Sequence, residues 1–221
     1  MLPHADDSIS RNGKSIILAY DHGLEHGPVD FEPNPDTADP ERLFELATHD
    51  AVTAIAVQKG IAEAYYPDYQ DDVNLLVKLN GTSNLWRGEP DSAVNCSPEY
   101  AAELGADAVG FTVYGGSNHE VEMAEEFRHA QEGAREHDMG VVMWSYPRGQ
   151  GLRNDSSPEV ISYAARLGLE LGADVVKVKY PGSAAGMAEA VEMAGPANVV
   201  MSGGTMRDDK AFLQNVANAI D

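Results

Sequence analysis

The lysines of this chain have an unusual distribution, because four of the six occur in short stretches rich in apolar and β-branched residues. These four are Lys59, Lys78, Lys177 and Lys179. Lysine is normally found on solvated helix faces and is uncommon in strands and cores. If the stretches are parallel strands, the amines gather at the rim formed by the carboxyl ends of the strands, where α/β barrels build their active sites. We therefore expect a cationic pocket that attracts anionic substrates.

Two of these lysines, Lys177 and Lys179, occupy alternate positions of one predicted strand. Strand periodicity places them on the same face. If that face lines a barrel, burial and mutual repulsion lower the pKa of both amines, and a neutral amine can attack a carbonyl group to form an imine. The alternative is that one or both lysines pair with a buried carboxylate such as Asp21. Spacing alone does not choose between the two lysines.

Trp144 and Tyr146 share a face of the preceding predicted strand. A tyrosine close to a lysine can relay protons through its phenol, and a tryptophan can exclude water from a pocket. Both residues could instead simply fill the interior of a barrel. Arg148, in the loop that follows, could bind a phosphate or only anchor the loop.

Asp21, His22 and His26 lie in a glycine-rich turn after the first predicted strand. These residue types can bind metals, but the turn does not place them on one helix face, and a lysine-rich rim would repel a dication. We therefore expect no metal here. The more suitable role for Asp21 is to orient Lys177 or a substrate hydroxyl.

The loop after the last predicted strand contains Ser202, Gly203 and Gly204 and leads into a helix. Exposed backbone N–H groups beside a helix amino terminus form an anion site. In α/β barrels, the loops after the seventh and eighth strands usually bind phosphate. We expect the same use of this loop.

Strands and helices alternate along the predicted chain. Strands are expected at residues 15–21, 52–59, 75–80, 108–114, 141–146, 175–180 and 199–202. Helical periodicity is found at residues 40–48, 98–104, 120–137, 158–171, 184–194 and 208–220. This alternation predicts a parallel sheet covered by helices.

A repeated junction favours a barrel. Residues 103–109 recur almost unchanged as residues 170–176, and each copy is a helix end that runs into a strand. A doubly wound open sheet is the alternative, but the first strand is not followed by a glycine-rich dinucleotide fingerprint. We therefore expect residues 1–221 to form a single (β/α)₈ TIM barrel domain. Only seven strands are predicted, so we expect the last βα unit to be missing after Asp221.

The charge balance limits the classes of partner. The chain has 36 acidic residues against 15 lysines and arginines, a formal net charge of −21. Such a protein repels nucleic acid. The acidity fits a salt-rich cytoplasm, in which the self-repulsion is screened, although an ordinary acidic cytosolic enzyme is the alternative. Cys96 is the only cysteine, which excludes an intrachain disulfide and a zinc–thiolate cluster. No stretch is long enough to span a membrane, so we expect a cytoplasmic protein.

Several motifs together carry a resemblance to a known family. They are residues 13–23, 58–63, 79–81, 144–149, 177–180 and 201–204. With these motifs the chain resembles the archaeal-type class I fructose-bisphosphate aldolases. The resemblance implies a (β/α)₈ barrel, a homo-oligomer, phosphorylated sugar substrates, and catalysis without a metal or other cofactor.

The resemblance also implies a role for each matching residue. Lys177 would form the imine and Tyr146 would act as the acid and base, with Asp21 and Trp144 as active-site supports. Phosphate would be held by Ser202, Gly203 and Gly204, and substrate binding is also expected of three further residues, Lys179, Arg148 and His22.

Two departures from the family pattern concern phosphate binding. The family continues into a last strand and a Gly-Arg loop, and it has a Pro-Lys pair where this chain has Thr205, Met206 and Arg207. Arg207 could supply the charge of that lysine. Two other functions stay open: a related barrel synthase that makes an amino-dideoxy-heptulosonate for aromatic amino acid biosynthesis, and a phosphosugar-binding protein without catalytic activity.

Overall fold

A curled, parallel sheet forms the centre of the molecule. The computed structural model describes residues 8–204 and 208–220 of the chain. Within these residues, seven strands pair in the order β1-β2-β3-β6-β7-β8-β9, and every pairing is parallel. The strands are β1 (Ile17–Tyr20), β2 (Ala54–Gln58), β3 (Leu75–Lys78), β6 (Ala108–Val113), β7 (Gly140–Ser145), β8 (Val175–Val178) and β9 (Asn198–Met201). A small antiparallel pair, β4 (Asn80–Gly81) and β5 (Ala93–Val94), lies outside this sheet.

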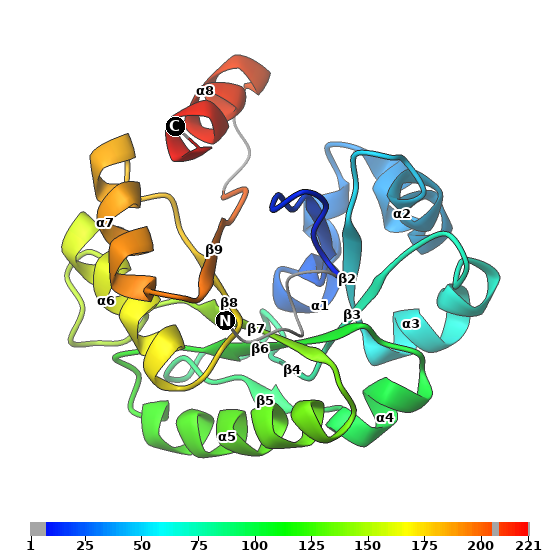
Figure 1. The fold of residues 1–221 in the computed structure, drawn as a ribbon, viewed down its shortest axis with the longest axis horizontal. Coiled ribbons are helices and arrows are strands. Elements are labelled where there is room, and N and C mark those ends of the chain that lie inside the picture. The colour runs from blue at the N-terminus through cyan, green and yellow to red at the C-terminus, as the bar shows by residue number, and fades with distance from the viewer. Residues whose placement is uncertain (1–7, 205–207, 221) are drawn as a thin grey trace.

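Helices surround the outer face of the sheet (Figure 1). They are α2 (Pro40–Ala47), α3 (Lys59–Tyr65), α4 (Pro98–Glu103), α5 (Glu120–Glu136), α6 (Pro158–Glu170) and α7 (Ala184–Ala194). Helix α1 (His22–Glu25) lies instead at the carboxyl end of β1, and α8 (Asp209–Ile220) follows β9. Short 3₁₀ turns occupy Pro28–Phe31, Pro35–Ala38 and Tyr66–Asp68. Helices α4, α6 and α7 each begin after a serine whose hydroxyl accepts a backbone N–H from the first turn, which satisfies one of the unpaired donors there.

The strands and helices predicted from the sequence are confirmed, with ends that differ by a few residues. Helix α1, helix α3 and the β4–β5 pair were not predicted. Lys59 was expected at the end of a strand, but it is the first residue of α3. It lies close to Cys96, where burial raises the pKa of the thiol to about 11 and the positive charge of Lys59 opposes that shift.

Apolar side chains on the two faces of the sheet form two separate cores. Along β3, Leu75 and Val77 join the large core between the sheet and the helices, whereas Leu76 points into the interior of the curled sheet. The interior core also contains Trp144 and Val175. Because strand side chains alternate, Lys78 and Lys177 fall on the interior side, two residues beyond Leu76 and Val175.

The repeated helix-to-strand junction fastens neighbouring strands to each other. Asp107 accepts a hydrogen bond from the backbone N–H of Leu75 at 2.8 Å, and Asp174 accepts one from Val141 at 2.9 Å. Each carboxylate thus binds the start of the strand beside its own. The second copy is also joined by an ion pair between Asp174 and Arg135 at 2.6 Å. These junctions hold the β3–β6 and β7–β8 pairs in register.

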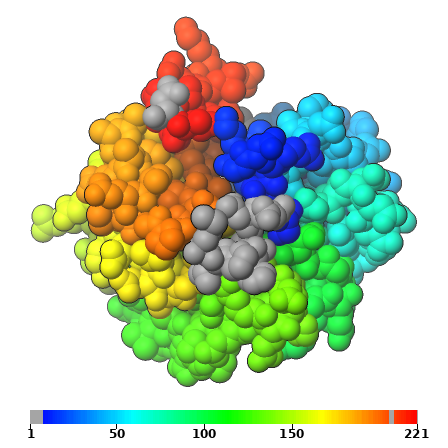
Figure 2. Space-filling model, in the orientation of Figure 1, coloured from blue at the N-terminus to red at the C-terminus, as the bar shows by residue number. Residues whose placement is uncertain are grey.

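Strands β1 and β9 lie at the two ends of the strand order, and in the part of the chain that the structure describes no pairing joins them. The fold is therefore a TIM-barrel-type sheet of seven strands, as expected from the sequence. Helix α8 packs against α7 and stands out from the rest of the surface (Figures 1 and 2). No helix among residues 8–204 and 208–220 is both long enough and apolar enough to cross a membrane.

We expect Asp174→Ala to lower the free energy of unfolding by about 3 kcal/mol, because it leaves the Val141 N–H and the Arg135 guanidinium without their shared partner. Glu132→Ala is the matched control, since it also removes one negative charge but breaks only an exposed pair with Arg128. Its cost should be about 0.5 kcal/mol or less. Urea denaturation of both variants measures the difference, and equal costs would show that the junction does not stabilise the fold.

Candidate active site

Lys177 lies on the interior side of β8, between the two strands that flank it. Its backbone is in register with Trp144 on β7 and with Val200 on β9. The Lys177 Nζ atom lies 4.7 Å from the centre of the Trp144 ring. The pKa of this amine is lowered to about 8, chiefly by burial and also by the positive charge of Lys78, while the charges of Asp21 and Glu25 oppose the shift. About a tenth of Lys177 is therefore neutral at pH 7, far more than of an ordinary lysine, and it is the neutral amine that can act as a nucleophile.

A second amine, Lys78, lies against the same indole. Its Nζ atom is 5.2 Å from the centre of the Trp144 ring, and its side chain is only 1% exposed. It donates hydrogen bonds to Asp21 at 3.0 Å and to Glu25 at 3.2 Å. The sequence predicted that a lysine neighbour lowers the pKa of Lys177. The structure identifies that neighbour as Lys78 on β3.

Lys179 is not that neighbour, so this part of the sequence interpretation is wrong. Strand β8 ends at Val178, and the Lys179 amine forms an ion pair with Asp155, in the loop after β7. The alternation that places two lysines on one face holds only while the strand continues. Lys179 therefore contacts the loop at the rim of the sheet.

The end of β1 supplies both carboxylates. Asp21 follows the strand directly, and helix α1 begins at the next residue. One helical turn then brings Glu25 to the same side, four residues later. Burial alone would raise the pKa of Asp21, but the charges of Lys78 and Lys177 and the hydrogen bond from Lys78 hold it below its ordinary value. Asp21 is thus a carboxylate, and it acts on Lys177 through its charge.

Tyr146 follows β7 on the side of Trp144. Burial raises the pKa of its phenol, while a hydrogen bond with Ser202 lowers it. The backbone N–H of Ser202 also donates to the Val178 carbonyl at 2.8 Å, which ties the loop after β9 to the end of β8. Tyr146 therefore holds its proton in the free protein, and Ser202 lies beside it.

Arg148 and Tyr114 form a second layer of the site. The Arg148 guanidinium carbon lies 5.0 Å above the Tyr114 ring, and the Arg148 backbone N–H donates to the Gly115 carbonyl at 3.0 Å. Burial raises the pKa of Tyr114, and the charge of Glu25 adds to the shift. The sequence interpretation missed Tyr114 and Glu25. The spacing of Asp21 and Glu25, one helical turn apart, is the signal that could have found Glu25.

The remaining predicted residues lie around this cluster. His22 packs against the rings of Tyr20 and Phe31, each with a centroid distance of 5.2 Å, and burial lowers its pKa. Gly203 and Gly204 are exposed after β9. Arg207 lies outside the described residues. Within residues 8–204 and 208–220, no group of three or more His, Cys, Asp or Glu side chains could hold a metal ion.

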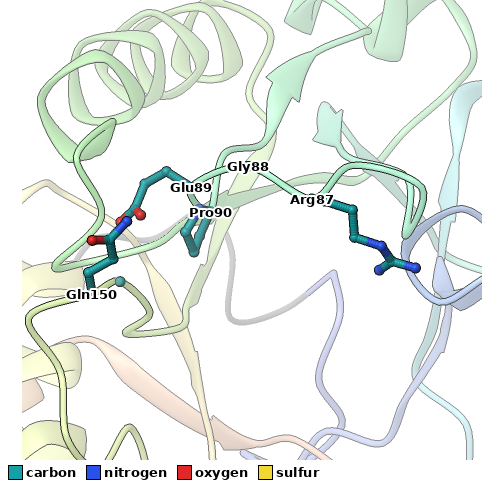
Figure 3. A pocket seen from close by; sticks show the side chains of 6 residues that line it. Arg87, Gly88, Glu89, Pro90 and Gln150 are labelled. Carbon is teal, nitrogen blue, oxygen red and sulfur yellow. The ribbon is translucent and has the colours of Figure 1, made fainter.

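A shallow hollow on the surface lies apart from the lysines. It is lined by Arg87, Gly88, Glu89, Pro90, Gly149 and Gln150. Glu89 and Gln150 face each other across it, whereas the side chain of Arg87 points away (Figure 3). Neither lysine lines this hollow, and we assign the chemistry to the cluster around Lys177, where a nucleophile, charged groups and a phenol meet.

The comparison with protein families agrees with this geometry. Residues 15–221 match the model of the DeoC/LacD family aldolases. The chain belongs to the DeoC/LacD family of aldolases. It is 71% identical to the class 1 fructose-bisphosphate aldolase of Halobacterium salinarum, over its full length and 84% of that protein. It is 48% identical to the class 1 fructose-bisphosphate aldolase of Thermoproteus tenax, over 96% of this chain and 80% of the relative.

Solved structures show the same likeness. An archaeal fructose-1,6-bisphosphate aldolase with its catalytic lysine covalently bound to the carbinolamine intermediate superimposes on this aldolase with a TM-score of 0.92. The two chains are 47% identical, and the match covers 96% of this chain and 84% of the other. The family resemblance predicted from the sequence motifs is therefore confirmed. The acidic composition also agrees with the similarity to a Halobacterium protein.

We expect Lys177 of this aldolase to react with small aldehydes at a rate that rises through about pH 8, because its ammonium form cannot attack. Acetaldehyde with cyanoborohydride at a series of pH values, followed by peptide mass spectrometry, measures the modified fraction. The peptide of exposed Lys14 serves as an internal reference for the reagents. A Lys177 rate that rises only near the ordinary lysine pKa of about 10 would contradict the assignment.

Proposed function

We propose that this chain is a class I fructose-bisphosphate aldolase that forms a Schiff base through Lys177. It would cleave fructose 1,6-bisphosphate to dihydroxyacetone phosphate and glyceraldehyde 3-phosphate, and catalyse the reverse addition. The observation that carries the proposal is the buried amine of Lys177, with a pKa of about 8, beside the Trp144 indole and two carboxylates. The 71% identity to a class 1 fructose-bisphosphate aldolase supports the choice of substrate.

The reaction begins with the neutral amine. Lys177 attacks the ketone carbon of dihydroxyacetone phosphate, and the carbinolamine loses water to give a protonated imine. This cation withdraws electrons from the adjacent carbon, which then loses a proton to give an enamine. The enamine adds to the aldehyde carbon of glyceraldehyde 3-phosphate, the new oxygen takes up a proton, and water releases the ketose and the amine. Cleavage is the reverse sequence.

Tyr146 is the proposed carrier of the proton. Its phenol is neutral in the free protein because burial raises its pKa. The protonated imine places a positive charge nearby, which lowers the cost of forming a phenolate. The phenol can therefore release its proton once the imine has formed, and take it back when the covalent intermediate is resolved. Trp144 keeps water from the amine.

Phosphate binding is assigned to the loops at the carboxyl ends of the strands. Ser202, Gly203 and Gly204 follow β9, the position at which barrels commonly hold phosphate. The Ser202 backbone N–H is bound to the Val178 carbonyl, so we assign the backbone contacts with phosphate to Gly203 and Gly204 and a hydroxyl contact to Ser202. We assign Arg148, Lys179 and His22 to the same rim, where two fixed positive charges complement an anionic substrate. A homo-oligomer stays a prediction of the family resemblance, and a cytoplasmic location stays a prediction of the sequence.

Borohydride reduction in the presence of dihydroxyacetone phosphate should leave a single reduced adduct on the peptide that contains Lys177. The reason is that reduction traps only the imine, which forms on the nucleophilic amine. Lys177→Met should abolish both the adduct and cleavage of fructose 1,6-bisphosphate. Activity should persist in EDTA, because the protonated imine replaces a metal as the electron sink. Loss of activity in EDTA, or trapping on another lysine, would refute the mechanism.

Tyr146→Phe should lower kcat by about 10²–10⁴-fold, because it removes the proposed proton carrier while the apolar ring is kept. Trapping with dihydroxyacetone phosphate should still modify Lys177, since imine formation depends mainly on the amine. Steady-state cleavage assays and intact-mass spectrometry measure the two effects separately. A variant that retains kcat would exclude Tyr146 from proton transfer.

A further inference from the structure

Lys78 is a buried charge that the proposed mechanism does not use. Its side chain is 1% exposed in the interior of the curled sheet, at the carboxyl end of β3. A lysine in such a place is costly unless carboxylates surround it. Asp21 and Glu25 do so, at 3.0 and 3.2 Å. Since buried ion pairs contribute little net stability compared with well-packed apolar residues, stability alone does not explain this arrangement.

The position of Lys78 relates it to Lys177. Strands β3 and β8 are separated in the sheet by β6 and β7, yet both amines lie within about 5 Å of the centre of one indole, that of Trp144 on β7. The charges that act on Lys177 are those of Asp21, Lys78 and Glu25. Two of them are negative and favour the ammonium form of Lys177, and only Lys78 opposes them.

The other titratable groups around the site do not replace Lys78. Burial raises the pKa of the Tyr146 and Tyr114 phenols, so both are neutral. Arg148 lies over the Tyr114 ring, and Lys179 is paired with Asp155. Among the described residues, Lys78 is therefore the cation whose charge acts on the Lys177 amine.

We propose that Lys78 is a positioning residue for imine formation: its ammonium, fixed by Asp21 and Glu25 against Trp144, offsets one of the two carboxylate charges and thereby increases the neutral fraction of the Lys177 amine. This inference rests on the proposed function. The remaining excess of one negative charge then stabilises the protonated imine once it has formed. The same cluster thus serves the neutral nucleophile before the reaction and the cation after dehydration.

The proposal predicts the sign of three pH shifts. The rate of trapping with dihydroxyacetone phosphate and cyanoborohydride is measured against pH by intact-mass spectrometry. Lys78→Met leaves two uncompensated carboxylates, so its midpoint should move up by about one pH unit or more. Glu25→Gln removes one negative charge, so its midpoint should move down. The double variant restores the original net charge, and its midpoint should return towards that of the parent chain.

Circular dichroism establishes which variants fold. If Lys78→Met does not fold, the other two variants still test the proposal. The midpoint of Glu25→Gln must lie below that of the parent chain, and the midpoint of the double variant must lie above that of Glu25→Gln, at or below the parent value. A purely structural role for Lys78 would lower the amplitude or kcat and leave the midpoints unchanged, which would overturn the inference. Trapping of the parent chain without any shift in the variants refutes only this inference, whereas no trapping of the parent chain refutes the proposed function as well.

Discussion

The contact of two lysine amines with one indole is the interaction on which the rest of the site depends. Trp144 lies inside the curled sheet with Lys177 at 4.7 Å and Lys78 at 5.2 Å from its ring centre. The indole has room only because residue 110 on the neighbouring strand is glycine: a Cβ atom there would lie 2.4 Å from the Trp144 ring. A cation near an aromatic face is attracted to it, but a desolvated amine also tends to lose its proton. In the proposed mechanism, the balance between these two tendencies sets the reactivity of Lys177.

Hydrogen bonds at the amino ends of the strands fix the sheet on which this contact is built. Asp107 and Asp174 bind the starts of the strands beside their own at Leu75 and Val141, and these strands, β3 and β7, end at Lys78 and Ser145 beside the charged site. The buried strand residues between are apolar on both faces. An apolar layer at the start of the strands therefore lies below a polar layer at their carboxyl ends, in which Lys78 is paired with Asp21 and Glu25, and Lys179 with Asp155. Parallel barrels are generally arranged in this way: residues at the amino ends of the strands stabilise the fold, and residues at the carboxyl ends form the active site.

Much of this could be predicted from the sequence, because the relevant signals are local. Apolar runs, helical periodicity and the repeated Gly-Ala-Asp junction depend on neighbouring residues, and the seven strands of the main sheet were found from them. Lysines within apolar runs identified the rim, and alternation placed Trp144 and Tyr146 on one face. The sequence was a poorer guide to which charged side chains pair with each other. Lys179 was assigned to the interior because alternation was extended past Val178, the last residue of β8.

The sequence by itself determined the alternation of strands and helices, the acidic surface, and the candidacy of Lys177, Tyr146 and Asp21. Only the tertiary structure decided which charges meet. Lys78 is 99 positions away from Lys177, and Glu25 is farther still, so no local pattern relates them. They come together because a curled parallel sheet brings the carboxyl ends of separate strands to one rim, and because α1 turns Glu25 towards it. Partners of a buried charge are set by that geometry, since the charge must be compensated by whatever groups the fold places within reach.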